Sequence, residues 1–212
     1  MCIRDRIHRG NIAGIFGDLI TLIEEDKREG KEETLKLVLP YSKTWFCLPS
    51  NFHLIGTMNT ADRSVESLDA ALRRRFTFVE LQPHPELLTQ PPISGVDLKK
   101  MLTMINKRIA ILLDEDHTIG HSYLMKIKTL AELKTVFSNK ILPLLEEYFY
   151  GDLGKVGLIL GKDFIEIEKS SADIFADFDY EYMHEIKDGV VYRLKSIEAL
   201  EASAFIQIYE KN

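Results

Sequence analysis

The sequence has few cysteines, no long apolar run and no excess of positive charge. Only two of its 212 residues are cysteine, Cys2 and Cys47, which excludes a disulfide framework and favours a reducing, cytoplasmic setting. No stretch approaches the roughly 20 apolar residues of a transmembrane helix, and no apolar run follows the charged start, so we expect neither a membrane span nor a secretory signal. The formal net charge of −6 argues against a nucleic-acid surface over the whole chain.

The first part of the sequence shows the alternation of helices and strands that is typical of an α/β fold. The predicted elements are a helix within 7–28, a β-hairpin over 35–48, a strand over 52–58 that is buried on both faces of a parallel sheet, a helix over 64–75 and a strand over 76–81. Acidic runs at helix ends, at 24–26 and 114–116, are expected to be solvated.

Beyond the proline-rich segment 83–92 the pattern becomes mostly helical. The predicted elements are helices over 97–113 and 130–150, the second with a kink near Pro143, strands over 164–168 and 189–194, and a short helix over 196–203. The sequence therefore predicts three domains: a partial α/β core over 1–84, a helical domain over 85–163 and a small mixed extension over 164–212.

One stretch carries most of the functional information. It reads Gly-Thr-Met-Asn-Thr-Ala-Asp-Arg-Ser over 56–64 and is followed by Leu-Asp-Ala-Ala-Leu-Arg-Arg-Arg-Phe over 68–76. A polar residue at the carboxyl end of a parallel strand lies where α/β folds place ligands, and arginines supply permanent charges suited to phosphate. These motifs closely resemble those of the McrB family of AAA+ NTPases, the GTP-driven subunits of modification-dependent restriction endonucleases. The similarity extends over about residues 7–160.

The resemblance implies a role for each matching residue. Asn59 would be sensor 1, which orients the attacking water, and Asp62 and Arg63 would shape the site and its guanine preference. One residue of Arg73, Arg74 and Arg75, with Arg74 favoured and Arg73 next, would be the arginine finger that reaches the next subunit's nucleotide. Asp5 would be the Walker B aspartate associated with Mg²⁺. The hairpin over 35–48 would be the insertion before sensor 1.

The resemblance also implies an assembly. The chain would be the C-terminal part of an AAA+ P-loop NTPase core, with a parallel sheet that lacks the Walker A strand, followed by a helical lid. Its cofactors would be GTP (or ATP) and Mg²⁺. Its partners would be a homo-oligomeric ring, expected to be a hexamer, and a McrC-like nuclease subunit, with DNA bound through a domain that this sequence does not contain.

Two departures from the family pattern affect this interpretation. Arg6 stands at the position of the catalytic glutamate, and no Gly-x-x-x-x-Gly-Lys-[Ser/Thr] phosphate loop occurs. We therefore expect an N-terminally truncated fragment with a foreign or miscalled start at residues 1–6, poorly stable and inactive alone. Two alternatives stay open: an ATP-using, MoxR-like remodelling ATPase, and a non-catalytic assembly subunit that donates arginine fingers. His117 and His121 have i, i+4 spacing but no third ligand, so no metal is expected there.

Overall fold

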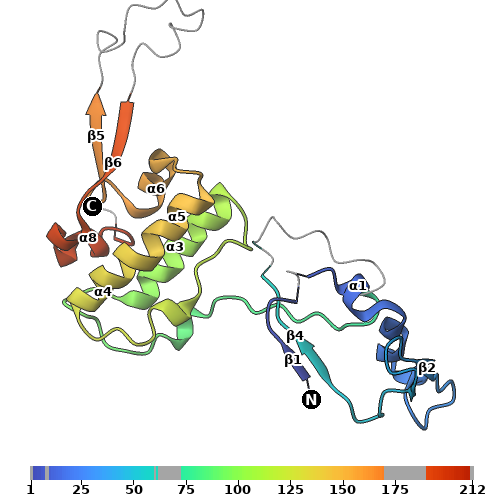
Figure 1. Cartoon of the computed structure of the whole chain (residues 1–212). Helices are drawn as coiled ribbons and strands as arrows, with labels where there is room; N and C mark the ends of the chain where they lie inside the picture. The colour runs from blue at the N-terminus through green and yellow to red at the C-terminus, as the bar shows by residue number, and fades with distance from the viewer. Residues whose placement is uncertain (1, 8–9, 60, 62–72, 170–189, 211–212) are drawn as a thin grey trace, which may run out of the picture. The chain divides into compact units, whose positions relative to one another are not determined.

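The chain divides into two units, Met1–Glu80 and Leu81–Asn212. The computed structural model describes residues 2–7, 10–59, 61, 73–169 and 190–210 (Figure 1). The first unit contains β1 (Cys2–Arg4), α1 (Ile12–Phe16), the 3₁₀ helices η2 (Gly17–Ile23) and η3 (Glu25–Lys27), β2 (Leu37–Val38), β3 (Trp45–Phe46) and β4 (Leu54–Gly56). Its buried apolar side chains among the described residues are Leu22, Ile23 and Leu48.

The predicted helix within 7–28 is only partly α-helical. α1 ends at Phe16, and the chain continues as the 3₁₀ helix η2. Gly17 has a φ of 49°, a left-handed conformation that an α-helix does not contain and that glycine adopts without steric cost. Among the apolar positions of the predicted helix, Ile23 is buried but Ile15 is 68% exposed, and Gly17 follows the end of the α-helical part.

The predicted hairpin over 35–48 is confirmed, since β2 and β3 pair antiparallel with Val38 opposite Trp45. β4 lies within the predicted strand 52–58 and pairs in parallel with β1, Ile3 opposite Ile55. Burial on both faces was wrong, because 47% of Ile55 is exposed. Among the described residues only β1 pairs with β4, so the strand has one neighbour rather than two.

The predicted strand over 76–81 is absent, which corrects the sequence analysis. These residues have no regular secondary structure, and Phe78, Val79 and Leu81 are 51%, 78% and 90% exposed. A strand is stabilised by hydrogen bonds to a neighbouring strand. No strand in the described parts of the chain pairs with this segment. The predicted helix 64–75 lies mostly outside the described residues.

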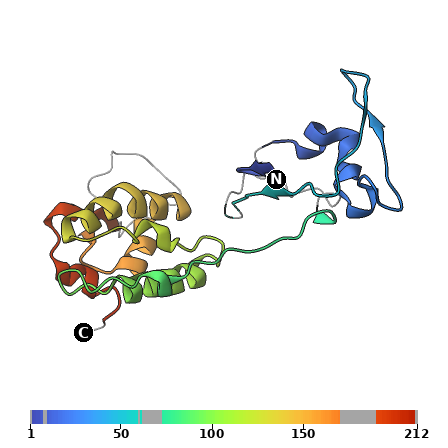
Figure 2. The same ribbon diagram turned by 90° about the horizontal axis from the view of Figure 1, so that it is seen from below.

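The second unit is a helical bundle that carries a hairpin (Figure 1; Figure 2). Its elements are η4 (Pro85–Leu87), α3 (Leu98–Leu112), η5 (His121–Tyr123), α4 (Leu130–Val136), the π-helical turn η6 (Phe137–Ile141), α5 (Leu142–Tyr148), α6 (Leu153–Leu160), β5 (Ile165–Lys169), β6 (Val190–Leu194), η8 (Ile197–Ala199) and α8 (Ala202–Ile206). α3 confirms the predicted helix 97–113, and the Asp97 side chain caps it by accepting from the Lys100 N–H.

The predicted helix 130–150 is interrupted near Pro143, as expected. The interruption is the π-helical turn η6 between α4 and α5. Proline has no N–H and its ring clashes with the carbonyl of the residue four positions earlier. The α-helical hydrogen-bond pattern therefore changes to the wider π-helical pattern just before Pro143. A capping box, in which Thr129 and Glu132 bond each other's backbone N–H groups, begins α4.

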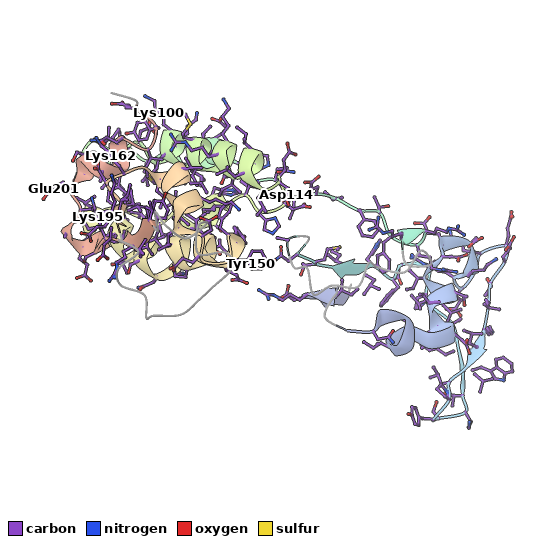
Figure 3. The ribbon with its side chains drawn as sticks, turned by 90° about the horizontal axis from the view of Figure 1, so that it is seen from above. Lys100, Asp114, Tyr150, Lys162, Lys195 and Glu201 are labelled. Carbon is purple, nitrogen blue, oxygen red and sulfur yellow. The ribbon has the colours of Figure 1, made fainter. Side chains whose placement is uncertain are left out.

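The predicted strands near 164–168 and 189–194 are confirmed by the antiparallel pair β5–β6. Lys162 and Lys195, labelled in Figure 3, lie at the base of this hairpin, where the Lys195 N–H donates to the Phe164 carbonyl. α6 was not predicted. It packs against β5, and a Cβ added at Gly157 would lie 3.2 Å from Ile165 Cγ1, so the absence of a side chain at Gly157 allows this close packing.

One hydrophobic core joins the bundle, the base of the hairpin and α8. At its centre Phe137, Phe164 and Phe205 are fully buried, with centroid separations of 5.0–6.0 Å and edge-to-face geometry in two of the three pairs. The division of this unit into a lid over 85–163 and an extension over 164–212 stays a prediction. Described residues of both contribute to the same core.

Candidate functional site

The parallel strands β1 and β4 end side by side, and the structure brings Asp5 and Thr57 together there. The Thr57 hydroxyl donates to the Asp5 carboxylate and accepts from the Arg6 N–H at 3.0 Å. The Ile7 N–H donates to the Thr57 carbonyl at 2.9 Å. The carboxyl edge of a parallel sheet is where α/β folds place ligands. Sequence reasoning gave Thr57 no role, although its motif position two residues before Asn59 was available.

The turn after β1 is held in an uncommon conformation. Arg6 has a φ of 48°, in the left-handed region that non-glycine residues rarely adopt. A Cβ added at Gly56 would lie 3.1 Å from the side chain of Ile7, so a larger residue there would force Ile7 to shift by a few tenths of an ångström. These contacts fix the backbone on both sides of the Asp5–Thr57 hydrogen bond.

Asn59 lies two residues beyond Thr57 on the same chain segment. Its side chain is exposed, and its Oδ1 accepts from the Ala61 N–H at 3.4 Å, which forms a local turn. Asp62 and Arg63, the other predicted binding residues, lie outside the described residues.

The three adjacent arginines differ in their surroundings. Arg73 and Arg74 are exposed, while the Arg75 side chain is only 16% exposed and its Nη2 lies 2.6 Å from Glu24 Oε1. The prediction that 24–26 is a solvated run was therefore wrong for Glu24. Its partner is 51 positions away in the sequence, so no local pattern indicates the pair.

The donor set at the β1–β4 edge fits a magnesium ion that is held mainly by a nucleotide. Mg²⁺ of this kind uses one or two carboxylates, a hydroxyl and phosphate oxygens, and it keeps several waters. Asp5 supplies a carboxylate and Thr57 a hydroxyl. The described residues contain no group of three or more His, Cys, Asp or Glu that could hold a metal ion by themselves.

A second polar cluster lies at the end of α3, where Asp114 is labelled in Figure 3. Asp114 Oδ1 accepts from the His117 N–H at 3.1 Å and lies 2.6 Å from His117 Nδ1. The His117 ring is buried and meets Tyr148 edge to face at 4.7 Å, and burial raises the pKa of Tyr148 to about 12. The Asp114 side chain is 45% exposed, as the predicted solvated run implies, but it also has a specific partner in His117.

The loop after this cluster is fastened to α3 by a buried asparagine. Asn106 donates to the Ile119 carbonyl at 2.9 Å and accepts from the Ile119 N–H at 2.8 Å. Just beyond, His121 Nδ1 accepts from the His84 N–H at 3.1 Å, which ties the segment after residue 81 to the helical unit. These contacts give residues 119–121 a defined conformation.

The Asp114–His117 pair predicts an acid-dependent loss of stability. The hydrogen bond from His117 lowers the pKa of Asp114 below its ordinary value of 3.8. The folded state therefore binds this proton less readily than the unfolded chain. The pair stabilises the fold above pH 3.8, and this contribution is lost as the pH falls through the lower, folded pKa.

We expect the Asp114→Asn variant to show a weaker decrease of unfolding free energy below about pH 4 than the unchanged protein. Urea titrations at several pH values measure this. Glu115→Gln, at an exposed neighbouring carboxylate, is the matched control and should keep the original slope. Equal slopes for all three proteins would contradict the prediction.

Two cavities of the second unit, of about 270 and 430 Å³, lie away from these residues. The first is lined by the segment after α6 and by α8, and the second by residues 90–94 and 127–130. Neither is lined by a predicted site residue. No helix in the described part of the chain is long and apolar enough to cross a bilayer.

Comparison with known proteins matches each unit to a family. Residues 1–76 match the AAA domain of the dynein-related subfamily, and residues 97–157 match the McrB alpha-helical lid domain. The chain is 36% identical over 169 residues to the type IV methyl-directed restriction enzyme EcoKMcrB subunit of Escherichia coli K12, an alignment that covers 70% of this chain and 36% of that protein. It is 28% identical over 198 residues to the type II restriction enzyme BsuMI component YdiS of Bacillus subtilis 168, with 82% and 57% covered.

The parallel strand pair with its polar edge, followed by a helical bundle, therefore defines an AAA-type protein with a helical lid. Within that class the chain belongs to the McrB family, whose relatives include subunits of restriction enzymes. The chain spans 36% and 57% of the lengths of these two relatives.

Proposed function

We propose that this chain is part of a nucleoside-triphosphate-hydrolysing AAA+ subunit, with GTP as the favoured nucleotide, that drives a partner nuclease in a modification-dependent DNA restriction system. The observation that carries the proposal is the Asp5–Thr57 hydrogen bond at the shared carboxyl edge of β1 and β4. Asn59 follows Thr57 by two residues on the same segment. The lid match and the restriction-enzyme relatives support the same proposal.

In this proposal the chain contributes positioned polar groups rather than a covalent intermediate. Mg²⁺, when bound with the nucleotide, would neutralise charge on the phosphates. Asp5 and Thr57 would hold that ion, and Asn59 would orient the attacking water. Asp62 and Arg63 would shape the same site. Arg73 and Arg74 are exposed, so either can reach a neighbouring subunit in a homo-oligomeric ring, for which we propose a hexamer.

Rates of GTP and ATP hydrolysis by the intact subunit, together with its nuclease partner, test the proposal. We expect faster turnover of GTP, complete dependence on Mg²⁺, and a decrease of kcat by about 100-fold in Asn59→Ala, because the attacking water loses its orientation. Asn51→Ala, at an exposed turn asparagine, is the matched control and should leave the rate unchanged. Faster ATP turnover would favour the MoxR-like alternative.

One observation favours a second candidate, a non-catalytic assembly subunit. Arg6 stands where the resemblance places the catalytic glutamate, its side chain is exposed, and a guanidinium cannot accept a proton from water. Absence of hydrolysis of both nucleotides by the intact subunit, with rate enhancement when it is mixed with a competent subunit, would support this candidate over the leading proposal.

A further inference from the structure

The ion pair between Arg75 and Glu24 separates one arginine of the triplet from the other two. The Arg75 side chain is 16% exposed and that of Glu24 is 34% exposed, with 2.6 Å between Nη2 and Oε1. Arg73 and Arg74 are both exposed. Three residues of the same type, side by side in the sequence, therefore have two different kinds of environment.

Glu24 belongs to one of the best-anchored segments of its unit. It directly follows Leu22 and Ile23, which are 0% and 6% exposed. Arg28 donates to the carbonyls of Ile23 at 2.9 Å and Phe52 at 3.0 Å, which ties this segment to the chain just before β4. A carboxylate on such a segment is held in a defined position and can hold its partner there.

Fixing Arg75 also limits where its neighbours point. Arg74 and Arg75 lie in a turn, and adjacent residues of a helix or helical turn do not face the same direction. With Arg75 directed to Glu24, the preceding two side chains project elsewhere, into solvent in this chain. Both members of the ion pair are partly buried, so removing one leaves the other without its partner, and we expect the turn to depend on both members.

We infer that Glu24 and Arg75 are positioning residues, which anchor the triple-arginine turn so that Arg73 and Arg74 face the nucleotide site of a neighbouring subunit, and that Arg75 is not itself the arginine finger. This inference rests on the proposed function, because it assigns roles in the same hydrolytic site. It gives a role to Glu24, a residue to which the resemblance assigns none.

A charge exchange tests the inference, because a positioning pair tolerates reversal whereas a finger does not. The variants are R75E, E24R and the double variant E24R/R75E, in the intact subunit. We expect each single variant to lower kcat by at least about 10-fold with the nucleotide KM within about 2-fold, and to lower the unfolding temperature. The double variant should recover kcat to within about 3-fold of the original, together with the unfolding temperature.

The matched control is E25R/R75E, which adds the same charge at the exposed neighbour of Glu24 and should recover neither quantity. An inactive double variant with a restored unfolding temperature would overturn the inference, because the guanidinium of Arg75 would then be needed at the phosphates. If the unchanged protein hydrolyses no nucleotide, the proposed function fails separately. The unfolding temperatures then test whether Glu24 anchors Arg75. Recovery of the unfolding temperature in E24R/R75E supports the anchoring, and no recovery overturns it.

Discussion

Replacing Arg74 by alanine is expected to lower the rate of nucleotide hydrolysis in the proposed ring by about 1,000-fold, because the proposed finger would neutralise charge that develops in the transition state of a neighbour's site. Nucleotide affinity of the same subunit should change little, since its own binding residues are intact. Steady-state hydrolysis and nucleotide binding measure the two effects. Arg193→Ala, at an exposed arginine of the β5–β6 hairpin, is the control and should not change the rate.

Mixed rings show whether Arg74 acts between subunits. Rings of R74A alone and rings of N59A alone should both be nearly inactive. In a random equal mixture, roughly a quarter of the sites combine an intact Asn59 with an intact Arg74 from the neighbour, so activity should return to about that fraction. No recovery on mixing would contradict action in trans. A larger loss in R73A than in R74A would move the finger to Arg73.

Replacing Phe137 by alanine is expected to destabilise the helical unit by about 3–5 kcal/mol. Phe137 is fully buried and contacts both Phe164 and Phe205, so the substitution opens a cavity where the bundle, the base of the hairpin and α8 meet. Chemical denaturation followed by circular dichroism measures the change.

The matched control for this substitution is Ile111→Ala, which removes an apolar side chain that is 81% exposed on α3. Its effect should stay within about 0.5 kcal/mol. A small effect of Phe137→Ala would mean that the three phenylalanines do not form a shared core. Loss of signal only from the hairpin would mean that α8 and the bundle unfold independently of it.

Some elements of this chain depend on local signals in the sequence, and others depend on partners that are distant in it. Apolar periodicity was sufficient to predict α3, and Pro143 was sufficient to predict an interruption near α5. The strand expected over 76–81 failed although its composition suits a strand, because a strand needs a partner and the composition of one segment does not supply it. The predicted α-helix ends before Gly17, whose positive φ is not compatible with a continuous α-helix.

By itself the sequence determined the family, the order of most elements and the residues Asn59, Asp5 and Arg73–Arg75 as candidates, because motifs, caps and apolar spacing are local properties of a chain. Only the tertiary structure decided how these residues are supported. Thr57 meets Asp5 across 52 positions, and Glu24 meets Arg75 across a similar separation. Such contacts arise when strand ends and turns are brought together by burial of apolar side chains elsewhere, and no pattern within either segment specifies the partner.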